Sequence, residues 1–84
     1  MWNLYVLLCE DGTLYTGITN NLEKRIADHK KGIGGRYTRS HKPIRLVYQE
    51  KITTRSQALK REFEIKSLKR EEKIKLLNLQ LSLK

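Results

Sequence analysis

The chain has 84 residues, 38% of them hydrophobic and 32% charged, which is enough for one domain with a single modest core. Its 18 lysines and arginines outnumber 9 acidic residues and give a formal net charge of +9. Such a charge attracts polyanions, so a nucleic-acid partner is favoured over a basic protein that charge merely keeps soluble. Residues 1–3 carry no basic side chain and the apolar run that follows is short, which argues against a signal peptide or a membrane span. We therefore expect a single cytoplasmic domain over residues 1–84.

The N-terminal part of the chain predicts a β-hairpin. Leu4–Cys9 and Thr13–Thr19 are rich in strand-forming residues, and Glu10-Asp11-Gly12 between them is a turn signal. Cys9 is the sole cysteine of the chain, so it has no partner for an internal disulfide or for a metal site of the usual spacing. We expect it to pack as a small hydrophobic residue in a reducing compartment.

The length of the hairpin loop decides where Tyr5 and Tyr15 point. A three-residue loop with Gly12 in the left-handed region would place both tyrosines on one face of the sheet, beside the side-chain-free Gly17. A two-residue Asp11-Gly12 loop would shift the register by one and separate them. Both alternatives are open, as is the simpler interpretation that the two tyrosines are ordinary sheet aromatics.

A first helix is predicted from Leu22 to Lys31, with Asn20 or Asn21 as its cap and Gly32 as its end. An apolar stripe along it would include Ile26 and, if the helix extended so far, Ile33. Two polar side chains four residues apart lie on one edge of that stripe, namely Arg25 and His29. They either point toward the sheet boundary or lie at the surface, with the arginine chain covering apolar area.

The second half of the chain predicts a basic loop, a third strand and two more helices. Residues 32–43 hold three of the five glycines and the only proline. A strand is expected over Ile44–Ile52, a helix capped by Thr53 or Thr54 over Arg55–Leu68, and a third helix from about Arg70 through Leu77. The leucines from position 77 alternate like a strand in a helix-favouring composition, which leaves residues 77–84 open. The fold class is α+β, a three-stranded antiparallel sheet flanked by about three helices.

Glu62 is the charged residue whose position most needs an explanation. The apolar face expected for the second helix consists of Ala58, Leu59, Phe63 and Ile65, and Glu62 projects from its middle. A carboxylate there loses hydration at a cost of a few kcal/mol unless something compensates it. A neighbouring Arg or Lys would do so structurally, and a bound divalent cation would do so functionally.

These positions together resemble the GIY-YIG nuclease superfamily, and more narrowly its short bacterial UPF0213 or YhbQ-like branch. The two name-giving motifs are matched by Leu4-Tyr5-Val6 and Tyr15-Thr16-Gly17, and the resemblance extends from Asn3 to about Leu77. The downstream arginine and histidine of the family are matched by Arg25 and His29, and its metal-binding glutamate by Glu62. Residues 34–39 match the loop of that branch, and residues 46–48 match its third strand. Leu4, Val6 and Thr16 depart from the family pattern, while the tyrosines and Gly17 keep it.

The resemblance implies a metal-dependent endonuclease that hydrolyses phosphodiester bonds, with structure-selective DNA of repair or recombination as the substrate and RNA not excluded. It implies one divalent ion, Mg²⁺ or Mn²⁺, held by Glu62. Arg25 would brace the phosphate, and Tyr5 would be the general base, which requires nearby positive charge to lower its pKa. Tyr15 and His29 would position water or phosphate. Contacts to nucleic acid are expected from Lys24, Arg36, Tyr37, Arg39 and Lys42.

Two other functions fit the same sequence. A non-catalytic DNA- or RNA-binding module on the same fold would keep the five residues as a phosphate-docking surface. A protein-interaction module would use the leucines after Ile74 to dock a partner or a second copy of the chain.

Overall fold

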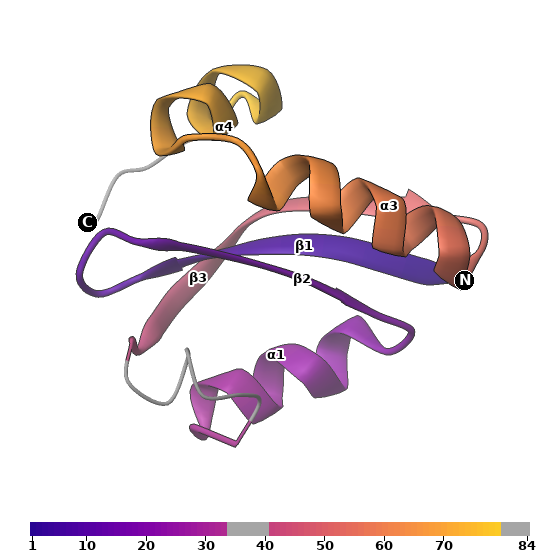
Figure 1. Cartoon of the computed structure of the whole chain (residues 1–84). Helices are drawn as coiled ribbons and strands as arrows, with labels where there is room; N and C mark the ends of the chain where they lie inside the picture. The colour runs from indigo at the N-terminus through magenta and orange to yellow at the C-terminus, as the bar shows by residue number, and fades with distance from the viewer. Residues whose placement is uncertain (34–40, 80–84) are drawn as a thin grey trace.

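The computed structural model describes residues 1–33 and 41–79, which form a three-stranded antiparallel sheet with helices on both faces (Figure 1). The central strand is β1, with β2 and β3 on either side of it. One face is covered by α1 and the other by α3 and α4 (Figure 1). This is the α+β architecture that the sequence predicts. The elements in chain order are β1 (Trp2–Cys9), β2 (Leu14–Thr19), α1 (Leu22–Lys30), β3 (Pro43–Ile52), α3 (Arg55–Lys66) and α4 (Arg70–Leu77).

The hairpin between β1 and β2 has the three-residue loop. The backbone N–H groups of Cys9 and Gly12 donate hydrogen bonds of 2.9 Å to the carbonyl oxygens of Thr13 and Cys9, respectively. Gly12 has a φ of 83°, in the left-handed region that glycine enters at no steric cost. The resulting register pairs Tyr5 with Gly17 and Leu7 with Tyr15. Of the two open alternatives, the structure shows the three-residue loop, which places both tyrosines on one face of the sheet.

Alternation along β1 divides its side chains between the two faces of the sheet. Leu4 and Val6 pack against Ile65 of α3 in the main core, which also includes Leu77 and Leu79. Tyr5 lies between them on β1 and faces α1, as does Tyr15 of β2. The strand is buried on both sides because it is central, and all of its residues from position 4 to position 9 are buried. Cys9 is fully buried, as expected for a small hydrophobic residue.

The helix boundaries lie close to the predicted ones. The side chain of Asn21 caps α1 by accepting a hydrogen bond from Lys24 N, and the side chain of Thr54 caps α3. Gly32, with a φ of 80°, follows the end of α1. Ile33 lies beyond the helix and is 67% exposed, so the condition under which it would extend the apolar stripe of α1 is not met.

The apolar face expected for α3 is only half correct. Ala58 and Ile65 are fully buried, whereas Leu59 is 39% and Phe63 76% exposed. The residues that turn toward the sheet are spaced like Ala58, Glu62 and Ile65, at intervals of four and three, so Glu62 does lie on the inner side of the helix. Its side chain is 21% exposed. The four apolar residues are compatible with two orientations of the helix about its axis, and the predicted orientation differs from the observed one.

The C-terminal residues that the structure describes belong to a helix and its cap. After α4, Asn78 adopts the left-handed conformation with a φ of 52°, and Leu79 returns into the core. Leu77 therefore belongs to a helix and not to the strand that the alternating leucines suggest. Positions 81 and 83 lie outside the described residues. Of the helices in the described ranges, none has the length and apolar character that crossing a membrane requires.

Candidate active site

A hydrogen bond between a strand and a helix lies at the centre of the site. The Tyr5 hydroxyl of β1 is 2.7 Å from Nε2 of His29 on α1, and both side chains are fully buried. The histidine is the next-to-last residue of α1, on the side of the helix that faces the sheet. Of the two open interpretations, an inward-pointing or a surface histidine, the structure shows the inward one.

Burial fixes the protonation states of this pair. It raises the pKa of Tyr5 to about 12, because desolvation outweighs the lowering effect of the hydrogen bond from Arg25. Burial also lowers the pKa of His29, and the Arg25 charge lowers it further. At neutral pH the tyrosine therefore keeps its proton and the histidine is neutral. A Tyr5 general base would require nearby positive charge to lower this pKa, and the net shift is in the opposite direction because desolvation is the larger cause.

Tyr15 completes an aromatic triangle with the other two rings. Its ring centroid lies 6.2 Å from that of Tyr5 and 5.1 Å from that of His29, with an edge-to-face geometry toward the histidine. Gly17, two residues after Tyr15 on β2, is required because this packing leaves no room for a side chain there. A Cβ atom at that position would lie 2.6 Å from the Tyr5 hydroxyl oxygen, so the space beside the tyrosines is filled by Tyr5 itself.

Arg25 brings a positive charge to the cluster from the N-terminal half of α1. Its guanidinium hydrogen-bonds the Tyr5 hydroxyl, and this contact raises the arginine's own pKa. Lys24, the residue before Arg25 on α1, forms an ion pair of 3.0 Å with Asp28, which lowers the pKa of that carboxyl group. A surface pocket is lined by Arg25, Lys24, Asp28 and residues 19–21. The mouth of the site is thus cationic on its α1 side.

Glu62 is the predicted site residue that the structure places apart. It belongs to α3, on the opposite face of the sheet from α1, and its carboxylate oxygen lies 3.3 Å from Nζ of Lys66. Within residues 1–33 and 41–79 no group of three or more His, Cys, Asp and Glu side chains could enclose a metal ion. Four of the five predicted residues, Tyr5, Tyr15, Arg25 and His29, are brought together in one cluster.

The residues expected to contact nucleic acid are only partly described. Lys42 is exposed just before β3, and Lys24 is exposed on α1 in its pair with Asp28. Arg36, Tyr37 and Arg39 lie outside the described residues.

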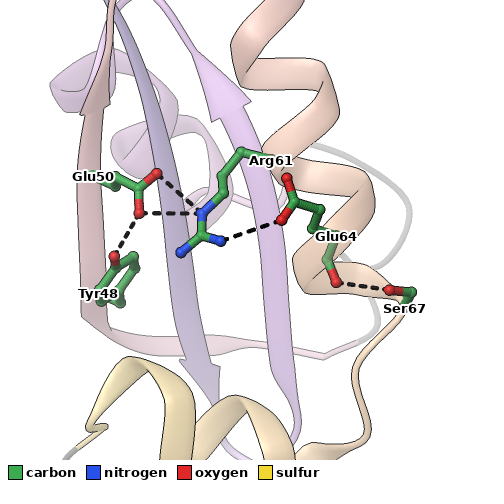
Figure 2. A network of polar contacts seen from close by, with 5 residues as sticks. All are labelled: Tyr48, Glu50, Arg61, Glu64 and Ser67. Carbon is green, nitrogen blue, oxygen red and sulfur yellow. Dashed lines mark hydrogen bonds and ion pairs between the residues drawn. The ribbon is translucent and has the colours of Figure 1, made fainter.

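A second polar network, which the sequence interpretation missed, joins β3 to α3 (Figure 2). Arg61 donates from Nε to both carboxylate oxygens of Glu50, at 3.1 and 3.3 Å, and Tyr48 donates its hydroxyl to Glu50 Oε1 at 2.7 Å. Glu64 lies 3.6 Å from the other side of the guanidinium. Two signals were available: Tyr48 and Glu50 are two residues apart on a strand, and Arg61 is three residues after the buried Ala58.

The network fixes the rotation of α3 about its own axis. Arg61 reaches toward β3, an outer strand of the sheet. Glu62 follows it by about 100° around the helix, so it turns to the other side, toward β2. Because α3 packs on β2 and β1 and β2 is the other outer strand, Glu62 lies near the edge of β2 that pairs with no strand of residues 1–33 and 41–79, called its free edge below.

Comparison with known proteins agrees with this architecture. A family model described as the GIY-YIG catalytic domain matches residues 1–75. The UPF0213 protein SSP2268 of Staphylococcus saprophyticus is 49% identical over 75 residues, covering 89% of this chain and 92% of the relative. The UPF0213 protein SH2523 of Staphylococcus haemolyticus is 46% identical over 74 residues, covering 88% and 90%. The solution structure of the UPF0213 protein BH0048 from Bacillus halodurans superposes with a TM-score of 0.61 and 37% identity, over 99% of this chain and 89% of that one.

Proposed function

This chain belongs to the GIY-YIG family, and on that premise we propose that it is a metal-dependent endonuclease that hydrolyses phosphodiester bonds of nucleic acid. The observation that carries the proposal is the buried hydrogen bond of 2.7 Å between the Tyr5 hydroxyl and His29, with Arg25 beside it. The substrates we propose are branched or flapped DNA structures of repair and recombination, since one small domain has little surface for reading a long sequence.

The protonation states support a proton relay from water through Tyr5 to His29. Arginine can only donate, so the Tyr5 oxygen accepts from Arg25 and the Tyr5 proton is directed at Nε2 of the neutral His29. As water attacks phosphorus, it passes a proton to the Tyr5 oxygen, while Tyr5 passes its own proton to Nε2. The bond to the leaving oxygen then breaks, that oxygen takes a proton from solvent, and the protonated His29 releases its proton to solvent, which restores the starting state. Tyr5 remains neutral throughout, which suits a hydroxyl with a pKa of about 12.

Arg25 and Tyr15 would hold the substrate around this relay. The guanidinium of Arg25 offers several N–H donors, of which the Tyr5 hydroxyl uses only part, and the rest suit a phosphate oxygen. Charge that develops on phosphorus would be stabilised there, in a site where desolvation strengthens the interaction. Tyr15, packed edge-on against His29, keeps the imidazole in the orientation that the relay needs.

The donor chemistry of Glu62 fits a single Mg²⁺ ion. Mg²⁺ prefers carboxylate oxygens and is often bound by one or two of them, with substrate phosphates and waters completing its shell. Glu62 is partly buried and its partner Lys66 is about half exposed, so the ion pair is weak enough to be exchanged for a cation. When bound, the ion would supply charge stabilisation to the phosphate. The site we propose therefore straddles the free edge of β2, with Glu62 on one side and the Tyr5 cluster on the other.

Cleavage of a panel of labelled DNAs tests this function. Single strands, duplexes, flaps and junctions are incubated with the protein in Mg²⁺, Mn²⁺ or EDTA. We expect cleavage with either metal and none in EDTA. Glu62→Ala should abolish cleavage and leave binding intact, while Glu64→Ala, a matched exposed glutamate on the same helix, should cleave normally. Equal loss in both variants, or full activity of Glu62→Ala, would contradict the assignment of Glu62.

A non-catalytic nucleic-acid-binding role is the second candidate, and one observation favours it. The Glu62 carboxylate is already matched by Lys66 on its own helix, as a purely structural glutamate would be. In that case the protein would bind the same DNAs but would cleave none of them in the presence of a metal. Lys66→Ala would then lower the stability of the protein and leave this absence of cleavage unchanged.

A further inference from the structure

Phe63 has no role in the proposed hydrolysis, and its position on the surface is unusual for a phenylalanine. It is 76% exposed on α3, and Leu59, one turn earlier, is 39% exposed. Four residues apart on a helix, the two side chains are neighbours and form one apolar strip. Burying a phenylalanine contributes about 1.5–3 kcal/mol to folding, and at this position the chain leaves most of that contribution unused.

The strip lies on the flank of α3 that also carries Glu62. Taking about 100° per residue, Leu59 lies about 60° and Phe63 about 100° around the helix from Glu62, in the direction away from Arg61. Arg61 reaches toward β3, so this flank faces outward past the free edge of β2. Phe63 is an exposed aromatic side chain, and it directly follows in sequence the glutamate whose carboxylate would hold the metal.

The charges around Phe63 indicate which partner it suits. Lys66 and Lys60 lie on either side of it, each about 60° around the helix, and both are exposed. Proteins bind single-stranded nucleic acids with aromatic rings flanked by cations, because the bases stack on the ring and the phosphates contact the positive charges. A protein partner with an apolar surface would instead find two lysines to desolvate at the rim of the strip.

We propose that Phe63 is a stacking platform for one unpaired nucleobase of the substrate, next to the phosphate that a metal ion held by Glu62 would contact. The inference rests on the proposed function for its location beside the scissile phosphate, but the stacking contact itself does not need catalysis. It makes the substrate class more specific: the nucleotide adjacent to the cleaved bond must be unstacked, as it is in a single strand, a flap or a junction. Lys60 and Lys66 would contact the phosphates on either side.

Binding of a fluorescently labelled oligonucleotide, measured by anisotropy in EDTA, tests the contact without cleavage. We expect Phe63→Ala to raise the Kd for single-stranded DNA by roughly five- to a hundredfold, and Phe63→Trp to restore affinity. Binding to a blunt duplex should change less than twofold. The matched control is Leu76→Ala, which removes an apolar side chain that is 60% exposed on α4. Its Kd should equal that of the wild type.

Abasic substitutions identify the base that stacks. With the wild-type protein, one abasic position should weaken binding as much as Phe63→Ala does, and with Phe63→Ala the same position should have no further effect. Equal losses in both proteins, or an unchanged Kd for Phe63→Ala in a normally folded protein, would overturn the proposal. So would sedimentation showing that Phe63→Ala converts a dimer to a monomer, because a second copy of the chain would then cover the strip.

The outcomes separate this inference from the proposed function. If no substrate is cleaved but the abasic pattern appears, the stacking platform stands and the nuclease does not. If cleavage depends on Glu62 but Phe63→Ala binds and cleaves like the wild type, the nuclease stands and the platform does not.

Discussion

Two tyrosine hydroxyls, one on each face of the sheet, lie in polar networks of opposite character. Tyr48 donates to Glu50, which is matched in turn by Arg61, so the cation of this network on the α3 face is already paired with carboxylates inside it (Figure 2). On the α1 face, Tyr5 meets a neutral histidine and the Arg25 guanidinium. A balanced network stabilises the protein alone, whereas a cation that faces neutral groups is suited to an anion from outside. The contrast supports our proposal that the network on the α1 face is catalytic, whereas the network on the α3 face stabilises the fold.

The most direct test of this difference between the networks is to remove one hydroxyl group from each of them. Tyr5→Phe should lower the rate of metal-dependent cleavage by about 10²–10⁴-fold, because the relay loses its central oxygen. The measurement is single-turnover cleavage of the best substrate at saturating protein. A rate within threefold of the wild type would show that Tyr5 is not in the proton path.

Gly17→Ala tests how tightly the Tyr5 network is packed. The new methyl group would lie 2.6 Å from the hydroxyl oxygen and 2.7 Å from Cζ of Tyr5, a ring that is fully buried. We expect a loss of about 1–3 kcal/mol in the free energy of unfolding, measured by urea denaturation. In a Tyr5→Ala background the same substitution should cost far less, and an equal cost in both backgrounds would rule out the clash as its cause.

Tyr48→Phe is the counterpart of Tyr5→Phe on the other face. It removes one hydrogen bond of 2.7 Å to Glu50, and we expect a loss of about 0.5–1.5 kcal/mol in the free energy of unfolding. The cleavage rate, measured below the unfolding transition, should equal that of the wild type. A large fall in that rate at unchanged stability would erase the distinction between the two networks.

The smallest expected effect is a pH dependence due to His29. Its pKa is lowered in the folded protein, so between that value and about 6.5 the unfolded chain binds more protons than the folded one. The stability that the neutral imidazole contributes is therefore present above pH 6.5 and is lost as pH falls. Urea denaturation at pH 7.5, 6.5 and 5.5 should show a slope of less than about 1.4 kcal/mol per pH unit. His29→Gln should show a flatter slope, and parallel slopes would contradict this assignment.

What the sequence predicts well is what local chemistry decides. The Glu10-Asp11-Gly12 turn signal predicts the hairpin itself, while it leaves two registers open, of which the structure shows the one that puts Tyr5 and Tyr15 on a shared face. Likewise, Asn21 and Thr54 cap their helices because their side chains satisfy nearby backbone N–H groups. These features need no knowledge of the rest of the fold.

What the sequence does not predict depends on packing between distant segments. Helical period alone could not choose between Phe63 and Glu62 for the inner side of α3, because the choice is made by Arg61 reaching Glu50 eleven residues away. The pKa of Tyr5 likewise depends on how closely α1 covers the sheet. A list of nearby charges suggests a lowered value, whereas desolvation, a property of the assembled fold, raises it.

The buried thiol of Cys9 has a practical consequence for spectroscopy. The side chain is fully buried and burial raises the pKa of its thiol, so little reactive thiolate forms at neutral pH. It is also the only cysteine in the 84 residues. A cysteine introduced on the exposed surface of α3 could therefore be alkylated with a fluorophore or spin label in the native protein while Cys9 stays unmodified. Such a label would report on the flank beside β2 in an otherwise unaltered chain.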